Sequence, residues 1–212
     1  MSQKTSHIAV LTGDLVHSSD LGPSKIEQAF AALENCAQTQ EKWHELRLRF
    51  TRHRGDGWQV AFERPWLAWR SALAFRAALK AEGSEFDTYI GIADGHISAP
   101  LPDDLNLATS APFENSGSTL DLVKATPGHR FGYHGNGVFN ATTTLFDHIS
   151  GDWTQAQAQA ILPKLAFLEQ PTVTDIAARL GKSRQTVAKS LDAAGYNTIQ
   201  YALACLEDME NA

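Results

Sequence analysis

The sequence predicts an α+β protein, with a ferredoxin-like sheet domain over residues 1–150 and an all-α helix-turn-helix domain over residues 151–212. Residues 46–62 alternate apolar and polar side chains on both sides of a glycine-rich break, which is a hairpin signal. A short apolar strand and a helical pattern precede this hairpin. The patterns are helical throughout after residues 151 and 152, which mark the expected domain boundary.

The first strand, over residues 7–16, carries the carboxylate Asp14 near its end. A buried acid in an apolar strand is costly unless it is paired, protonated or bound to a metal. In a ferredoxin-like order the first strand lies antiparallel to the third, so Asp14 should meet Asp56 in the hairpin turn. Two carboxylates at one point suit a hard cation such as Mg²⁺ together with phosphate oxygens. The alternative is that Asp56 only forms an Asp-Gly turn and that Asp14 is a cap.

Glycines flank the hairpin carboxylate at Gly55 and Gly57, where they let the backbone bend and let a ligand approach closely. Ser24 caps the first expected helix, whose start offers backbone N–H groups to a phosphate. We expect the remaining elements of this domain as helices at about 24–43, 66–79, 114–125 and 138–149, and as strands at 88–98 and 130–133.

Composition limits the classes of function that the chain can serve. A hydrophobic share of 43% suffices for a core, and a net charge of −6 argues against general coating of nucleic acid while leaving a local basic face open. The eight histidines show no metal-ligand spacing, so no zinc site is predicted. Cys36 and Cys205 lie far apart in helical contexts, no segment has the length of a membrane span, and the first residues lack a signal-peptide core. These features predict a cytoplasmic protein without a membrane partner.

Residues 172–181 and 183–194 form a helix-turn-helix pattern, with Gly181 at the turn and Ser183 as the cap of the second helix. The polar side chains expected to contact DNA phosphates and bases are Lys182, Ser183, Arg184, Gln185 and Lys189. Such helix pairs also serve as protein-interaction modules. Acidic residues crowd the end of this region, so the structural alternative stays open.

Several of these residues resemble a known family. Asp14 in an apolar strand, the turn around Asp56 and the strand over residues 90–97 resemble the catalytic domain of class III nucleotidyl cyclases, whose palm-like core is shared with diguanylate cyclases and polymerase palms. Over nearly the full length the sequence is similar to the SatD-like family, a short cyclase-type domain followed by a helix-turn-helix. That similarity rests on residues 11–14, on 58–59 after the turn, on 91–95 and on a C-terminal Thr-x-x-x-Ile-Ala-x-x-Leu pattern.

The cyclase resemblance implies roles for individual residues. Asp14 and Asp56 would be ligands of Mg²⁺ or Mn²⁺, with the carbonyl of Leu15 assisting. Arg52 falls where cyclases keep a base-recognising lysine, and Glu114 falls near their second base-reading residue. The resemblance therefore predicts a nucleoside triphosphate or another nucleotide as the ligand.

The resemblance departs from the cyclase pattern at the pair that stabilises the transition state. Asp121 stands in place of the asparagine, Ala125 stands in place of the arginine, and Lys124 is one position away. Losing a placed charge of this kind typically costs on the order of 10²–10³ in rate. We therefore expect metal-dependent nucleotide binding without cyclisation by the standard arrangement.

Three hypotheses follow for the function. The preferred hypothesis is a DNA-binding regulator whose cyclase-like domain senses a nucleotide with Mg²⁺ or serves for dimerisation. Because helix-turn-helix proteins usually read two half-sites, it predicts a homodimer. The second hypothesis is an active nucleotidyl cyclase or a related metal-dependent phosphotransferase. The third is a structural or interaction protein that has no ligand.

Overall fold

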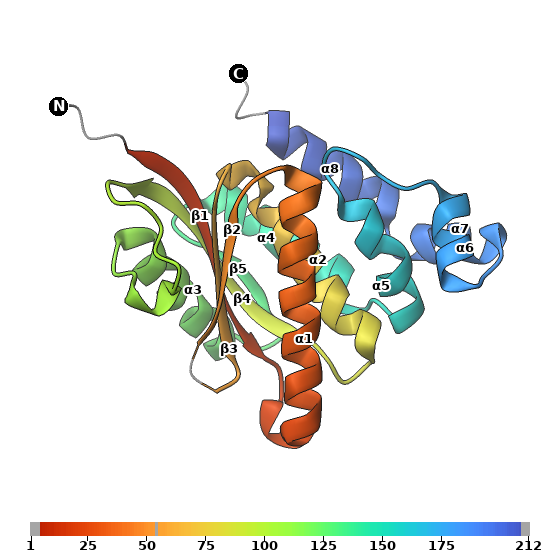
Figure 1. The fold of residues 1–212 in the computed structure, drawn as a ribbon, viewed down its shortest axis with the longest axis horizontal. Coiled ribbons are helices and arrows are strands. Elements are labelled where there is room, and N and C mark those ends of the chain that lie inside the picture. The colour runs from red at the N-terminus through yellow and green to blue at the C-terminus, as the bar shows by residue number, and fades with distance from the viewer. Residues whose placement is uncertain (1–4, 54, 209–212) are drawn as a thin grey trace.

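The computed structural model describes residues 5–53 and 55–208, which form one mixed five-stranded sheet with helices on both of its faces (Figure 1). The strands are β1 (Ser6–Leu15), β2 (Leu48–His53), β3 (Gly57–Glu63), β4 (Thr88–Ile97) and β5 (Phe131–Tyr133). The longer helices are α1 (Ser18–His44), α2 (Ala68–Glu82), α3 (Ala111–Ala125), α4 (Gly137–Gly151), α5 (Gln155–Ile161), α6 (Val173–Leu180), α7 (Arg184–Ala193) and α8 (Tyr196–Asp208). The α+β class that the sequence predicts is confirmed.

The sheet has the strand order β2-β3-β1-β4-β5. Strand β1 lies antiparallel to both β3 and β4, β2 lies antiparallel to β3, and β5 adds in parallel to β4. The predicted antiparallel pairing of the first and third strands is therefore confirmed. In this register Asp14 lies opposite Gly57 of β3 on one side and Tyr89 of β4 on the other.

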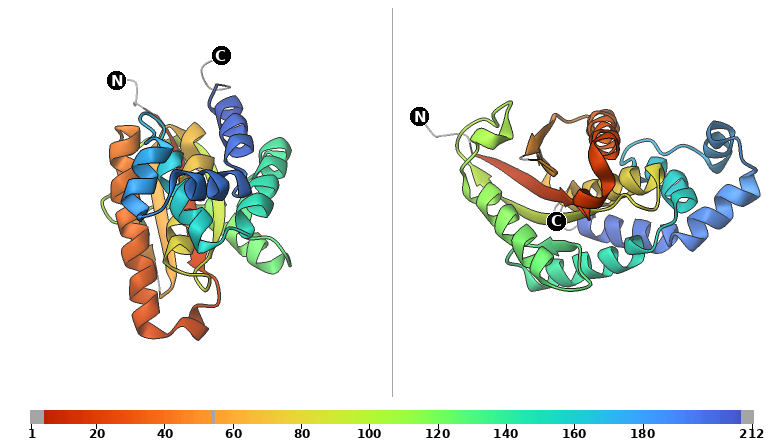
Figure 2. Two further views of the ribbon diagram at one scale, coloured as in Figure 1. Left: turned by 90° about the vertical axis from the view of Figure 1, so that its right-hand side faces the viewer. Right: turned by 90° about the horizontal axis from the view of Figure 1, so that it is seen from below.

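Helices α1 and α2 cover one face of the sheet, and α3 covers the other (Figures 1 and 2). Successive residues of β1 point to opposite faces. Ala9 and Leu11 therefore belong to the core under α1 and α2, whereas Ile8 and Val10 pack with Phe113 of α3. By the same alternation, Asp14 points to the face that α3 covers.

Helix α3 lies close to the sheet because glycine occupies the contact in β4. A Cβ atom added to Gly91 would come 2.2 Å from the carbonyl oxygen of Ser116 and 2.4 Å from the backbone nitrogen of Leu120. No real Cβ contact is that short, so only glycine fits there. This close approach brings the last turn of α3 over the end of β1.

A buried ion cluster joins α2, α4 and the segment before β4. Arg76 is 0% exposed, and its guanidinium lies 2.9 Å from Asp87 and 2.7 Å from Asp147. Lys80 Nζ and Arg130 Nη1 also reach Asp87, at 3.3 and 2.5 Å. We name this set of five residues the ion cluster.

Of the C-terminal helices, α5 and α8 contact α2. Helix α5 begins with a capping box of Thr154 and Gln157, and α6 begins with one of Thr172 and Asp175. Arg70 of α2 pairs with Glu207 of α8 at 2.6 Å. The buried apolar side chains of α5, α6, α7 and α8 belong to the same core as those of α1 and α2. The division into two domains at residues 150 and 151 stays a prediction.

Helices α6 and α7 lie at the end of the molecule farthest from α3 (Figures 1 and 2). Gly181 ends α6 in the left-handed conformation with φ of 61°, and Ser183 accepts a hydrogen bond from the N–H of Thr186 at the start of α7. The predicted turn glycine and cap are therefore confirmed. Within the described residues, no helix is long and apolar enough to cross a membrane.

Candidate functional site

The structure brings Asp14 and Asp56 together at the end of β1. The N–H of Leu15 donates a hydrogen bond to the carbonyl oxygen of Asp56 at 3.2 Å, which fixes the hairpin turn beside the strand. The Asp56 carboxylate accepts a hydrogen bond from the hydroxyl of Ser18, and the Asp14 carboxylate forms an ion pair with Lys124 from the last turn of α3. We call Asp14, Ser18, Asp56 and Lys124 the carboxylate site.

The pKa values of the two acids at this site are shifted in opposite directions. Burial raises the pKa of Asp14, the Lys124 hydrogen bond opposes this, and the negative charge of Asp56 adds to it. Burial also acts to raise the pKa of Asp56, but hydrogen bonds from Ser18 and from its own backbone amide overcome it and lower the pKa. Lys124 has a raised pKa because it donates to Asp14. One ammonium group thus stabilises two neighbouring carboxylates.

The donor set suits a hard divalent cation. Two carboxylates and one hydroxyl are oxygen ligands of the kind that Mg²⁺ prefers, with water and phosphate oxygens completing its shell. No group of three or more His, Cys, Asp or Glu side chains in residues 5–53 and 55–208 could hold a metal by itself. An ion here would therefore depend on ligands from outside the chain, and the assignment of Asp14, Leu15 and Asp56 as metal ligands stays a prediction.

Arg52 lies apart from the carboxylate site. Its guanidinium is 3.9 Å from the ring centroid of Phe30 and 2.8 Å from Glu27, both on α1. Arg52 therefore lies on the α1 face of the sheet, whereas Asp14 points to the α3 face. Its side chain also donates to the carbonyl oxygen of Gly55 at 3.4 Å, so it holds the hairpin.

Glu114 and Lys124 occupy opposite ends of α3. Glu114 is in the first turn and Lys124 in the last. Ten residues of helix span about 15 Å. The structure therefore does not bring Glu114 to the carboxylate site. Asp121 is nearer, because its negative charge contributes to the raised pKa of Lys124.

The hairpin glycines act on the turn itself. Gly55 has φ of 73°, a conformation that glycine adopts without strain. A Cβ atom on Gly57 would lie 2.7 Å from the carbonyl oxygen of His53. Both positions therefore shape the turn that holds Asp56 beside Asp14.

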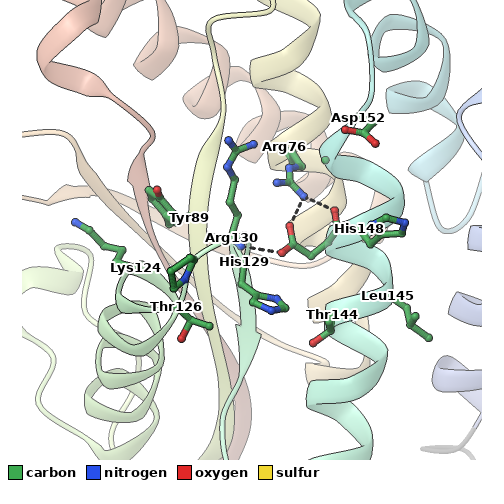
Figure 3. Close-up of a pocket in the computed structure, with 14 residues that line it drawn as sticks. Arg76, Tyr89, Lys124, Thr126, His129, Arg130, Thr144, Leu145, His148 and Asp152 are labelled. Carbon is green, nitrogen blue, oxygen red and sulfur yellow. Dashed lines mark hydrogen bonds and ion pairs between the residues drawn. The ribbon is translucent and has the colours of Figure 1, made fainter.

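Sequence reasoning missed Ser18 and a pocket between α3 and α4. The predicted cap at Ser24 is wrong, because α1 already begins at Ser18 and Ser24 lies within it. Ser18 reaches Asp56 because His17 turns the chain in the left-handed conformation with φ of 51°. The pocket has a volume of about 560 Å³, and α3 and α4 flank it (Figure 3). Lys124 and Tyr89 line its side nearest the carboxylate site. No local sequence pattern marks a pocket whose walls come from four separate segments.

The residues predicted to contact DNA lie on one exposed surface at the start of α7. Arg184, Gln185 and Lys189 are exposed, and Lys182 is half-buried beside them. Ser183 is exposed as well, while its hydroxyl caps the helix. Val187 and Leu191 point into the core. The polar side chains of α7 thus lie on its outward face.

No model of a known protein family matches this sequence, and neither does any curated protein. A bacterial light-regulated adenylyl cyclase structure is 16% identical, with 61% of this chain and 76% of that chain covered and a TM-score of 0.45. The active GGEEF domain of a diguanylate cyclase from Vibrio cholerae is 12% identical, with 62% and 85% covered and a TM-score of 0.45. The guanylyl cyclase Cya2 is 16% identical, with 56% and 73% covered and a TM-score of 0.37. At these identities and scores we carry no residue role over from these proteins.

Proposed function

We propose that this protein is a cytoplasmic DNA-binding regulator whose sheet domain binds a nucleotide with Mg²⁺ or Mn²⁺ at the carboxylate site. The observation that carries this proposal is that Asp14, at the end of β1, and Asp56, in the turn between β2 and β3, lie together beside Lys124. Two acids sharing one ammonium group are short of positive charge. A divalent cation supplies that charge, and a phosphate supplies its missing ligands.

The residues of the site have separate tasks in this proposal. Asp14 and Asp56 hold the cation, and Ser18 orients Asp56 by its hydrogen bond. With a cation held by Asp14 and Asp56, the Lys124 ammonium group would be available to a phosphate oxygen. The cation would supply positive charge that neutralises the phosphates.

Binding without cyclisation is the expected outcome. Ala125 carries no charge, and Asp121 adds a negative charge near Lys124, where cyclisation would need positive charge. The enzyme alternative, a cyclase or related phosphotransferase using the same two acids, predicts cyclic product or pyrophosphate from a nucleoside triphosphate. A product assay with each nucleotide separates these two possibilities.

A thermal-shift screen tests nucleotide binding. ATP, GTP, CTP and UTP are each added with and without Mg²⁺. A ligand at 100 times its Kd adds about 2.7 kcal/mol to the free energy of unfolding, or roughly 5–10 °C in Tm for a chain of this size. We expect such a shift for at least one nucleotide, and we expect it to require Mg²⁺. If no nucleotide shifts the Tm, the sheet domain does not sense nucleotides and the proposal is wrong.

The exposed polar face of α7 supports DNA as the second ligand. Arg184 and Lys189 are placed for phosphate and base contacts, and the cap at Ser183 presents the helix start outward. A homodimer would present two such helices to two half-sites, which is part of the same proposal. The structural alternative has the α6–α7 pair serve contacts within the protein and predicts no DNA binding.

DNA binding is tested by selecting sequences from a random pool and measuring the salt dependence of affinity. The change is Arg184→Ala with Lys189→Ala. We expect affinity to fall about tenfold or more, and the salt slope to fall by about two, because two phosphate contacts are lost. Lys42→Ala with Arg47→Ala removes the same charge from another exposed surface and should leave both quantities unchanged. Equal losses in the two double variants would mean that only net charge matters.

A further inference from the structure

The pocket between α3 and α4 has a floor that the proposed function does not use. Arg76 and Asp147 form part of this floor, and Arg130 stands between the two helices (Figure 3). His129 and His148 line the pocket from opposite sides, Lys124 lies at one edge, and Asp152 lies at another. At about 560 Å³ the pocket is within the size range of small-molecule sites.

The ion cluster beneath this pocket carries an excess of positive charge. Arg76, Lys80 and Arg130 bring three cations to the two carboxylates of Asp87 and Asp147. Burial acts to raise the pKa of Asp87, but the charges of Arg76 and Lys80 overcome it and hold the pKa below its ordinary value, so this carboxylate is ionised at neutral pH. Arg76 and Lys80 are buried, so water screens their positive charge little, and an anion at the pocket would be stabilised by it.

The guanidinium of Arg76 has one nitrogen without a hydrogen-bond partner among the described residues. Its Nε donates to Asp87, and its Nη1 donates to Asp147 and to Ser150. Its Nη2 is buried and has no hydrogen-bond partner among the described residues. The ring centroid of Phe131 lies 4.3 Å from the guanidinium carbon, so this group is packed although Nη2 has no polar partner. Its charge remains available to stabilise an anion in the pocket above it.

We propose that the α3–α4 pocket binds the phosphate group of a small phosphorylated ligand, independently of metal at the carboxylate site. Arg130 has a side chain that is 36% exposed, so its guanidinium meets the phosphate first. Arg76 supplies fixed positive charge beneath it. A phosphate also offers several acceptor oxygens to His129 and His148, whereas a carboxylate offers two.

The choice of a doubly charged anion follows from the surroundings. The ion cluster at the floor carries an excess of one positive charge, and the two histidines add donors at the rim. Asp152 is the opposing carboxylate, but it is exposed and lies at the edge. The balance at the floor therefore favours phosphate over a neutral sugar or a cation.

The test is a calorimetric titration of the full chain with inorganic phosphate in chloride buffer without Mg²⁺. We expect saturable binding, weakened at least tenfold in Arg130→Gln and in Thr144→Phe. Thr144 is half-buried on α4 and lines the pocket, so the phenylalanine fills the space without changing charge. Arg47→Gln removes an exposed arginine elsewhere and should bind as the unchanged protein does.

The controls separate this site from the carboxylate site. Asp56→Asn should keep phosphate binding here, whereas it should lose metal-dependent nucleotide binding. If Arg130→Gln lowers stability, Thr144→Phe decides the question. The inference is overturned if phosphate does not bind up to about 10 mM, if both variants bind as tightly as the unchanged protein, or if acetate binds as tightly as phosphate.

Discussion

Replacing Asp87 by asparagine is expected to lower the free energy of unfolding by about 3–5 kcal/mol, because it leaves Arg76, Lys80 and Arg130 facing Asp147 alone. Asp87, Arg76 and Lys80 are 6%, 0% and 7% exposed, so water compensates little for the two buried cations that lose their partner. For a chain of this size the corresponding fall in Tm is roughly 10 °C. Urea denaturation of the purified variant measures the effect.

A matched control is Asp103→Asn. Asp103 also pairs with two arginines, Arg47 and Arg49, but its side chain is 86% exposed. Exposed ion pairs contribute about 0–1 kcal/mol, so this variant should be nearly as stable as the unchanged protein. If the two asparagine variants lose the same free energy, the ion cluster does not stabilise the fold as described.

The pH dependence follows from the direction of the Asp87 shift. Burial acts to raise the pKa of Asp87, but the charges of Arg76 and Lys80 overcome it and hold the pKa below its ordinary 3.8. The unfolded chain therefore takes up the proton first as pH falls. The stabilisation is present above pH 3.8 and is lost as pH falls through the lower pKa of the folded state.

Asp14→Asn is expected to have the opposite effect on stability and a large effect on ligand binding. Burial and the charge of Asp56 raise the pKa of Asp14, so the fold disfavours its ionised form above that pKa. A neutral asparagine removes this penalty. It also removes the pair with Lys124, whose side chain is 44% exposed and whose contribution is small. Without ligand, the free energy of unfolding of the variant should equal that of the unchanged protein or exceed it by up to about 1 kcal/mol.

The same substitution should weaken metal-dependent nucleotide binding about 100-fold or more, because it replaces a charged carboxylate ligand of the cation by a neutral amide. Asp20→Asn is the control, since Asp20 is an exposed acid on the first turn of α1 near the site. It should change neither stability nor affinity. A structural role for Asp14 predicts the reverse pattern, in which the variant loses stability and keeps its affinity.

The juxtaposition of Asp14 and Asp56 could be predicted because strand alternation and a ferredoxin-like order determine it together. Alternation identified β1 and the hairpin, and the order placed the first strand beside the third. The start of α7 after its cap Ser183 could be predicted as well, since a capping serine and a turn glycine are local signals.

The contacts across the sheet could not be predicted in this way. Arg52 turned to the α1 face, where the ring of Phe30 and the carboxylate of Glu27 hold it, and alternation alone does not say which face a helix covers. Lys124 reaches Asp14 because glycine at position 91 lets α3 approach the sheet. That distance depends on packing between segments far apart in the sequence.

The pairing of charges in the ion cluster could not be predicted from the sequence either. Arg76 and Lys80 lie on a helix that pattern analysis treats as an apolar core element, and their carboxylate partners come from positions 87 and 147. A charged residue in such a helix gives no local sign of its partner. Its burial therefore depends on tertiary structure.

In the proposed function, Asp14 and Asp56 hold a divalent cation together with a nucleotide. Titration with Mn²⁺ followed by electron paramagnetic resonance measures it directly, because the signal of free Mn²⁺ falls as the ion binds. In the presence of the nucleotide found by thermal shift, we predict saturable Mn²⁺ binding that disappears in Asp14→Asn and persists in Asp20→Asn. Equal Mn²⁺ binding by the unchanged protein and by Asp14→Asn would contradict the claim.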